Sequence, residues 1–343
     1  MSAASRSAEG GSRIPRWAVP AVVAGGLLLG CSGGSGPTVI KLAHSLDVGH
    51  PVHRAMTHMA ERVAQRSGGG LRIDIYPGEQ LGSERECVEL VQIGSLGMTK
   101  VSASVAEGFV PAFRVFSLPY LFASREHYFA VLEGPIGREL LMAGERVRLR
   151  GLCYFDAGSR SFYTRSTPVR SPADLAGLKI RTQESASAMR MVQALGGSAT
   201  PIAWGELYTA LQQGVVDGAE NNPPSFYLSR HYEVCKVYSL DEHTAVPDLL
   251  LIGTEVWNDL SSAQQQLLQE AAREAAELQK RIWQEASDEA LAAVAAAGVE
   301  ILRPRKEPFA EKVAPLWEEY RNEPEIDAWI RRIRAAAGRS RDE

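Results

Sequence analysis

Three polar residues stand where strands are predicted to end. Ser102 closes one predicted strand, Arg181 closes another, and Asn221 follows a third. In open α/β sheets, ligands bind in the crevice outside the carboxyl ends of parallel strands. An arginine there suits a carboxylate, because its planar guanidinium can donate two parallel hydrogen bonds. If the three strand ends converge, the sequence predicts a site for an acidic small molecule.

The chain lacks the motifs of common catalytic sites. It contains no H-E-x-x-H, no P-loop and no G-x-G-x-x-G sequence. His50, His53 and His58 lie close together, but no carboxylate follows them at the spacing of a zinc protease. Capping, surface or ligand-facing roles fit these histidines better than a metal site. We therefore expect no metal, no cofactor and no enzymatic activity.

Strands and helices are predicted to alternate along the chain that holds these residues. Apolar and β-branched runs predict the strands, and apolar residues at helical spacing predict the helices. Short strand–helix–strand connections indicate the α/β class, with parallel-rich sheets covered by helices. The first unit has predicted strands 38–43, 71–76 and 96–102 and helices 52–63 and 83–94; the second has strands 177–181 and 215–219 and helices 184–195 and 204–214. Ser83 and Glu86 have the Ser-x-x-Glu spacing of a capping box, which predicts a helix start there.

The C-terminal third is predicted to be helical. Ser261 and Gln264 form a capping box, and neither Gly nor Pro interrupts residues 262–297. At 1.5 Å per residue this helix would be about 54 Å long, which is enough to span two lobes of a small protein. Its apolar stripe indicates that it packs against other elements.

Composition places the chain among ordinary globular proteins. Of its 343 residues, 45% are hydrophobic and 23% are charged, which excludes a disordered or disulfide-scaffold chain. The net charge of −4 argues against a general nucleic-acid binder, which would carry a basic surface. Cys87, Cys153 and Cys235 form no C-x-x-C motif, so we expect buried free thiols.

The N-terminus is predicted to be a lipoprotein signal peptide over residues 1–30. A basic lead is followed by the uncharged stretch 17–30, which is too short for a transmembrane helix but fits a signal-peptide core. The sequence Leu28-Leu29-Gly30-Cys31 resembles a bacterial lipobox, in which Cys31 is lipidated. Residues 31–37 then form a flexible Gly/Ser tether. An uncleaved membrane anchor is the alternative.

Several motifs together resemble the substrate-binding proteins of TRAP transporters, the DctP-type family. The longest is the run from Trp204 to Pro224, which contains Tyr-Thr-Ala-Leu-Gln-Gln-Gly-Val-Val-Asp-Gly. The resemblance extends from Val39 to Tyr320. Its other parts are Tyr76-Pro77-Gly78, Gln80-Leu81-Gly82, Leu118-Pro119-Tyr120-Leu121-Phe122, Gly158-Ser159-Arg160, Leu178-Lys179-Ile180-Arg181-Thr182-Gln183, Glu242-His243-Thr244 and Pro247-Asp248.

This resemblance implies a two-lobed periplasmic binding protein that closes on its ligand like a flytrap. Hinge strands and the long helix would join the lobes, with 38–160 mainly in lobe 1, 161–250 mainly in lobe 2, 251–325 as C-terminal helices and 326–343 as a tail. The protein would capture an organic acid outside the cytoplasmic membrane and deliver it to a sodium-coupled permease. We expect it in the periplasm, anchored to a bacterial membrane through Cys31.

The resemblance also implies roles for particular residues. Arg181 matches the principal carboxylate-binding arginine, Arg160 the second arginine, and Asn221 the asparagine that steadies the carboxylate. Trp204 matches an aromatic position of the pocket wall, although a core position is the alternative. Glu84, Lys100 and Ser102 match positions that face the rest of the ligand, and solvation is the alternative for Lys100. Three further residues, Asp47, His50 and Glu242, are polar candidates near the crevice.

The identity of the acid is predicted only as a class. Lys100 and Ser102 replace the Phe and Glu of sialic-acid members, which argues against sialic acid. The many polar candidates favour a hexuronate or related sugar acid, because buried hydroxyls need hydrogen-bond partners. A C4-dicarboxylate is the alternative, with Lys100 as its second cationic anchor. A ligand sensor for a membrane receptor and, less favoured, a periplasmic sugar-acid enzyme are the alternatives from other functional classes.

Overall fold

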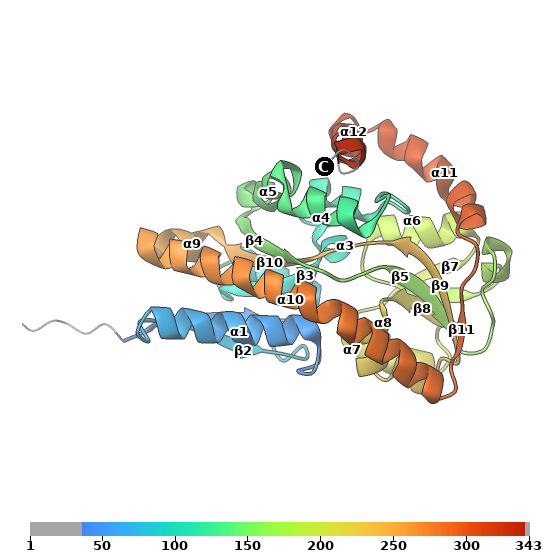
Figure 1. The fold of residues 1–343 in the computed structure, drawn as a ribbon, viewed down its shortest axis with the longest axis horizontal. Coiled ribbons are helices and arrows are strands. Elements are labelled where there is room, and N and C mark those ends of the chain that lie inside the picture. Colours follow the sequence, from blue (N-terminus) through green and yellow to red (C-terminus); the bar gives the residue numbers. More distant parts are fainter. Residues whose placement is uncertain (1–35, 340–343) are drawn as a thin grey trace, which may run out of the picture. The chain divides into compact units, whose positions relative to one another are not determined.

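The computed structural model describes residues 36–339 and contains two mixed β-sheets, one in each of two lobes (Figure 1). The sheet of lobe 1 has the order β2-β1-β3-β10-β4, with β1 (Thr38–Ala43), β2 (Leu71–Tyr76), β3 (Met98–Ser102), β4 (Leu149–Phe155) and β10 (Asp248–Gly253). The sheet of lobe 2 has the order β11-β9-β5-β8-β6-β7, with β5 (Arg160–Thr164), β6 (Lys179–Thr182), β7 (Ser198–Pro201), β8 (Gly218–Asn221), β9 (Val237–Thr244) and β11 (Glu300–Leu302).

Strand exchange between the lobes adds antiparallel pairs to both sheets. The chain crosses from β4 to β5 and returns from β9 to β10. In lobe 1, β10 runs antiparallel to β3 and β4, whereas β1 runs parallel to β2 and β3. In lobe 2, β5 runs antiparallel to β8 and β9. The two crossing segments are therefore the strands that connect the lobes.

Helices cover both faces of each sheet. Lobe 1 carries α1 (Pro51–Arg66), α2 (Glu84–Gln92), α3 (Ala103–Ala106), α4 (Arg125–Glu133), α5 (Pro135–Met142), α9 (Thr254–Asp259) and the 3₁₀ turns Pro111–Ser117 and Glu145–Val147. Lobe 2 carries α6 (Ala186–Leu195), α7 (Trp204–Gln212), α8 (Pro223–Leu228) and the 3₁₀ turns Pro172–Leu175 and His231–Glu233. The predicted capping box of Ser83 and Glu86 is present at the start of α2.

The side chains of central strands contribute to a core on each side of each sheet. Leu249 and Leu251 of β10 join the core beneath α4 and α5, whereas Leu250 and Ile252 join the core beneath α1. Successive strand residues point to opposite faces, so a fully apolar strand such as β10 serves both cores. The three cysteines of the described residues are buried and unpaired, as predicted.

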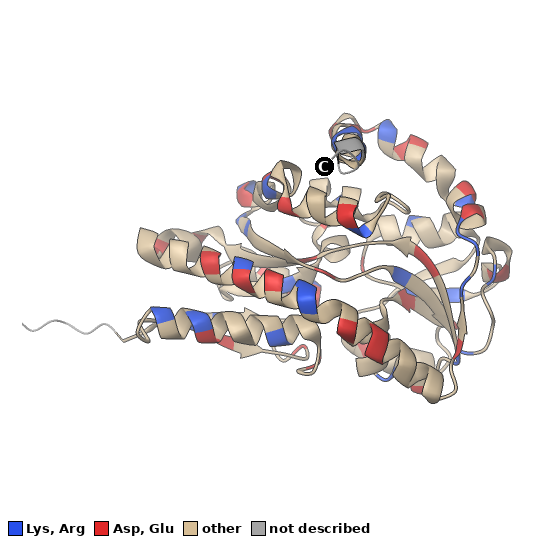
Figure 2. Ribbon diagram, in the orientation of Figure 1, with Lys and Arg blue, Asp and Glu red and all other residues tan. Residues whose placement is uncertain are grey.

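The long helix α10 (Ser262–Ala296) connects the lobes as predicted, and its capping box at Ser261 and Gln264 is present. Its N-terminal half packs beside α1 in the lobe 1 core, and Val294 belongs to a lobe 2 core (Figure 1). Acidic and basic residues are interspersed along the helix (Figure 2). No helix within residues 36–339 has the length and apolar character needed to cross a bilayer.

The C-terminal segment differs from the predicted tail. Residues beyond α11 (Glu307–Arg321) form a further helix, α12 (Pro324–Arg339). Trp329, Ile330 and Ile333 of α12 are buried in the lobe 1 core, and this apolar face is the reason the segment folds back. The predicted lobe boundary at residue 250 also falls inside β10, a strand of the lobe 1 sheet. The predicted signal peptide and lipidation site, Cys31, lie outside the described residues.

Candidate ligand-binding site

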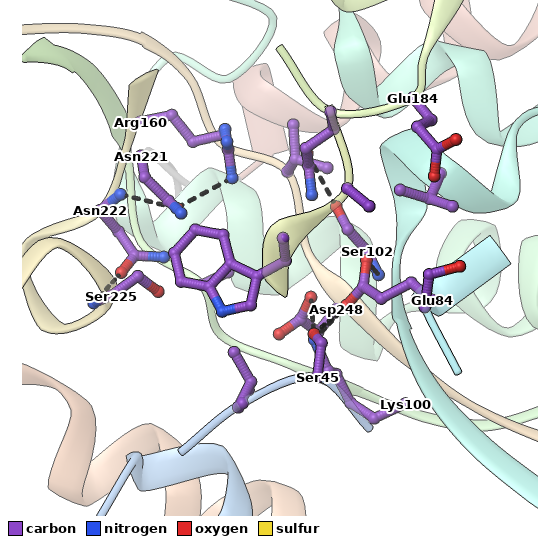
Figure 3. Close-up of a pocket in the computed structure, with 18 of the residues that line it drawn as sticks. Ser45, Glu84, Lys100, Ser102, Arg160, Glu184, Asn221, Asn222, Ser225 and Asp248 are labelled. Atoms are coloured by element: carbon purple, nitrogen blue, oxygen red, sulfur yellow. Dashed lines mark hydrogen bonds and ion pairs between the residues drawn. The ribbon is translucent and has the colours of Figure 1, made fainter. Parts of the chain in front are cut away.

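A pocket, termed the central pocket, lies where strand ends of both lobes meet, and its empty volume is about 570 Å³. Seven predicted site residues line it: Glu84, Lys100, Ser102, Arg160, Arg181, Trp204 and Asn221. Figure 3 shows two polar groups facing each other, with Arg160, Asn221, Asn222 and Ser225 from lobe 2 on one side and Ser45, Glu84, Lys100, Ser102 and Asp248 on the other.

Arg181 is a buried cation that forms no ion pair with a carboxylate of the described residues. It lies on β6, in register with Ala219 of β8, and only 2% of its surface is exposed. Its Nε donates to the carbonyl oxygen of Ile202 at 2.8 Å, but its Nη1 has no hydrogen-bond partner among the described residues. Burial holds the pKa of this guanidinium below its ordinary value. The side chain is therefore the unsatisfied cation of the pocket.

Arg160, in contrast, is fully engaged by its neighbours. Its guanidinium grips the Glu220 carboxylate through Nε and Nη2, the latter bond being 2.8 Å long. Its Nη1 donates to Oδ1 of Asn221 at 3.0 Å. Burial alone would lower the pKa of Arg160, but Glu220 outweighs that effect and raises it. Glu220 thus neutralises the charge of Arg160, and Arg160 has fewer N–H groups free to bind a ligand than Arg181 has.

A charged histidine, His243, lies beside the Arg160–Glu220 pair. His243 on β9 is fully buried, with Nδ1 at 2.8 Å from Asp241 Oδ2 and Nε2 at 3.5 Å from Glu220 Oε2. Burial alone would lower its pKa, but the Asp241 and Glu220 carboxylates raise the pKa to about 9. The pKa of Glu220 is lowered to about 2, because Arg160 and His243 outweigh the effect of burial. At neutral pH His243 and Glu220 are therefore both ionised.

This network predicts how stability depends on pH. A group whose pKa rises on folding stabilises the folded state fully below its unfolded pKa, about 6.5 for histidine. The stabilisation by His243 is therefore expected to decline as the pH rises from about 6.5 to about 9. The slope is roughly 1.4 kcal/mol per pH unit. Urea unfolding across this range should show the decline, and His243→Gln should flatten it; an equally steep decline in the variant would contradict the assignment.

Lys100 forms a second charged group on the opposite wall. Its Nζ lies 2.6 Å from Glu84 Oε1 and 3.4 Å from Asp248 Oδ1, and only 2% of its side chain is exposed. Strand register creates this cluster, because Asp248 of β10 pairs with Ser102 of β3, two residues from Lys100 on the same face. Burial would lower the pKa of Lys100, but Asp248 and Glu84 outweigh it and raise the pKa. One ammonium is thus shared by two carboxylates.

Trp204 and Asn221 complete the wall around Arg181. Trp204 begins α7, and its ring centroid lies 5.7 Å from the Arg181 guanidinium. The ring lines the pocket and also packs against the lobe 2 core, so both interpretations made for it apply. The Oδ1 atom of Asn221 accepts from Arg160 and from the Asn222 backbone N–H at 2.9 Å. Its amide nitrogen is then the atom available to donate into the pocket.

Asp47, His50 and Glu242 do not line the central pocket. The Nδ1 atom of His50 caps α1, and its Nε2 atom lies 3.3 Å from Ser225 Oγ. His50 and Asp47 line a neighbouring cavity. Asp47 accepts from the Gly49 backbone N–H at 2.7 Å. Glu242 pairs with Lys306 on the far side of the connecting strands. Proximity in sequence to a strand end thus did not bring these three side chains into the central pocket.

Several lining residues were not predicted as site residues. Ser45 follows β1, and its position two residues beyond the strand end was a usable signal. Gln183 and Asp248 stood within the quoted motifs but had no role assigned. Asn222 directly follows β8 and caps α8 by accepting from the Ser225 backbone N–H at 2.9 Å. Residues 36–339 contain no cluster of three or more His, Cys, Asp or Glu side chains suited to a metal ion.

Comparisons with known proteins agree with this geometry. The family model for bacterial extracellular solute-binding proteins of family 7 (DctP) matches residues 42–323. A solved TRAP solute-binding protein of Anaerococcus prevotii with bound D-glucuronate is 37% identical, with a TM-score of 0.86, and covers 88% of this chain and 99% of its own. One from a Bradyrhizobium species with bound D-galacturonate is 38% identical, with a TM-score of 0.84, and covers 86% of this chain and 98% of its own.

A curated relative carries a different ligand in its name. The C4-dicarboxylate-binding periplasmic protein DctP of Rhodobacter capsulatus is 30% identical over 288 residues, which are 82% of this chain and 86% of that protein. Members of this family bind solutes and do not transform them. The chain belongs to bacterial extracellular solute-binding protein family 7 and is a periplasmic solute-binding protein of the TRAP transport type.

Proposed function

We propose that this protein binds a hexuronate such as D-glucuronate or D-galacturonate, with its carboxylate on Arg181. The observation that carries the proposal is the buried guanidinium of Arg181, which has no ion-pair partner among the described residues. A buried charge without a partner is costly, so a ligand carboxylate is the group that completes this site. Asn221 and Trp204 line the pocket beside the carboxylate position.

The opposite wall favours hydroxyls over a second carboxylate. Lys100 is already shared by Glu84 and Asp248, so two carboxyl groups face a single ammonium at that end of the pocket. A second ligand carboxylate there would be repelled, whereas sugar hydroxyls can donate to the two acidic side chains. Lys100 is therefore a poor second anchor for a C4-dicarboxylate. The uronates in the two similar solved structures support this choice of ligand.

Capture involves contacts made between the lobes around the ligand. Ser102 Oγ donates to Gln183 Oε1 at 3.2 Å, and the Gly205 backbone N–H donates to Glu79 Oε2 at 3.1 Å. Each of these hydrogen bonds joins lobe 1 to lobe 2. A ligand that touches Arg181 and Lys100 at once interacts more strongly with the closed arrangement than with an open one, and its binding shifts the population towards closure.

The membrane partner follows from the family, and the mode of attachment is proposed from the sequence. A TRAP permease receives the bound acid. Lipidation at Cys31, which lies outside the described residues, would hold the protein at the membrane surface. Detergent partitioning of the full chain tests this attachment, and Cys31→Ala should move the protein into the aqueous phase.

Calorimetry with matched ligands tests the proposed specificity. D-glucuronate or D-galacturonate should bind, whereas D-glucose, which lacks the carboxylate, and succinate, which lacks the hydroxyls, should bind at least about tenfold more weakly, since each charge-assisted hydrogen bond contributes roughly 1.5–3 kcal/mol. At a ligand concentration of about 100 Kd, the free energy of unfolding should rise by about 2.7 kcal/mol. Succinate binding more tightly than both uronates would overturn the proposal.

A further inference from the structure

A second large cavity lies at the junction of the lobes, and the proposed ligand site does not use it. This hinge-side cavity has an empty volume of about 1510 Å³. Lobe 1 contributes residues 120–125 to its wall, lobe 2 contributes residues 242–244, and α10 contributes Trp283 and Ser287. Because both lobes and the long connecting helix line this space, its size depends on how the lobes are oriented.

The two connecting strands separate this cavity from the central pocket. Residues of each connection are divided between the two spaces. On the first connection Asp156, Gly158 and Ser159 face the hinge-side cavity and Ala157 and Arg160 face the central pocket; on the second, Thr244 and Ala245 face the former and Val246 and Asp248 face the latter. The two spaces therefore lie back to back across the hinge.

Two motifs that ligand binding does not explain meet at the hinge-side cavity. The Tyr120 backbone N–H, in the motif Leu118–Phe122, donates to the His243 carbonyl oxygen at 2.9 Å, and Tyr120 Oη donates to that of Asp241 at 3.3 Å. Tyr120 has φ 55° and Glu242 has φ 50°, so both adopt left-handed backbone that L-residues rarely adopt. Such conformations persist only where the surroundings enforce them, and they are frequent in switch regions.

The structure shows the closed arrangement of the lobes. Ser102 and Gln183 are hydrogen-bonded across the central pocket, and so are Glu79 and the Gly205 backbone N–H. In this arrangement the hinge-side cavity is wide. Rotation about the connecting strands that separates the lobes on the pocket side must bring their walls together on the opposite side. The hinge-side cavity is therefore largest when the central pocket is closed.

We propose that the hinge-side cavity controls the equilibrium between the open and closed lobes, and that filling it favours closure. A bulky group there fits while the cavity is wide, but it opposes the approach of the lobe 1 residues Ala123–Arg125 to the opposite wall on opening. Because apparent affinity scales with the fraction of binding-competent protein, a group that destabilises the open form tightens ligand binding without touching the ligand. The expected change in affinity rests on the proposed uronate ligand, whereas the expected change in lobe position does not.

Tryptophan substitutions at two small residues of the cavity wall test the proposal. Ser159 lies on the first connecting strand and Ser287 on α10, and neither lines the central pocket. The indole fills space, and the serine hydroxyls around it offer acceptors for its N–H. Ser159→Trp and Ser287→Trp are each expected to lower the Kd for D-glucuronate by about tenfold, if the closed form is the minor state of the free protein. Slower dissociation should account for most of this gain.

Small-angle scattering of the unliganded variants separates this proposal from the identity of the ligand. Their profiles should move from that of the unliganded wild-type protein towards the profile calculated from this closed structure. Gln266→Trp, at an exposed position of α10 outside both cavities, is the control and should leave affinity and scattering unchanged. Two folded cavity variants with wild-type scattering would overturn the proposal, even if uronates proved not to be the ligand.

Discussion

Replacing Arg181 by methionine is expected to abolish uronate binding while leaving the unliganded protein at least as stable as the wild type. Two charge-assisted hydrogen bonds from the guanidinium to a carboxylate contribute roughly 3–6 kcal/mol, which corresponds to about 10²–10⁴-fold in Kd. The side chain also lines the pocket beside Trp204, and methionine retains much of that packing area. Calorimetric titration with D-glucuronate measures the loss of affinity.

The expected effect on stability has the opposite sign for a physical reason. Arg181 is buried and its pKa is lowered by that burial, which means that the folded protein disfavours the charge it holds. Replacing such a group with an apolar side chain removes the cost of desolvation. Thermal unfolding of the unliganded variant should therefore give a Tm equal to or above that of the wild type. A functional site of this kind is maintained at the expense of stability.

Two further variants make the assignment specific. Arg181→Lys keeps a positive charge but loses the forked geometry, so its affinity should lie between those of the wild type and the methionine variant. Arg190→Met removes an exposed arginine of the same lobe and should change neither affinity nor Tm appreciably. A methionine variant that binds D-glucuronate within threefold of the wild type would exclude Arg181 as the carboxylate anchor.

Local sequence signals predicted the local elements of this fold well. The strands at Thr38–Ala43 and Leu71–Tyr76 have the predicted bounds, and both predicted capping boxes are formed. The pairing of strands was harder to predict from the sequence. The strand Asp248–Gly253 has apolar residues on both faces, and nothing in it specifies a partner. Its return to the lobe 1 sheet depends on contacts between residues far apart in sequence, and these also decide that α12 packs back on lobe 1.

The same distinction applies to the candidate site. Arg181 stands out in the sequence because it closes a strand, but its lack of a partner is visible only in the folded chain. Glu220 engages Arg160 although 59 residues separate them in the sequence, and no local pattern marks that pair. Glu242 was grouped with the pocket residues, yet strand geometry at the end of β9 directs it to the opposite cavity. Residue type predicted chemistry, whereas long-range packing decided which residues share a surface.

Replacing Lys100 by methionine is expected to destabilise the protein by about 3–5 kcal/mol, the usual cost of leaving a buried charge unpaired. The substitution leaves the carboxylates of Glu84 and Asp248 close together without the ammonium that lies between them. Burial and the neighbouring Glu84 already raise the pKa of Asp248, and loss of Lys100, which opposes them, should raise it further. Urea unfolding at pH 8 measures the destabilisation.

The pH dependence of this loss identifies its cause. In the variant, protonation of Asp248 relieves the repulsion, so the difference from the wild type should be smaller at pH 5 than at pH 8. Lys100→Met combined with Asp248→Asn should recover part of the stability at pH 8, because one unpaired carboxylate is removed. Lys179→Met, at an exposed lysine on β6, should change stability by no more than about 0.5 kcal/mol. An equal loss at both pH values, without recovery in the double variant, would show that Lys100 acts through packing rather than through charge.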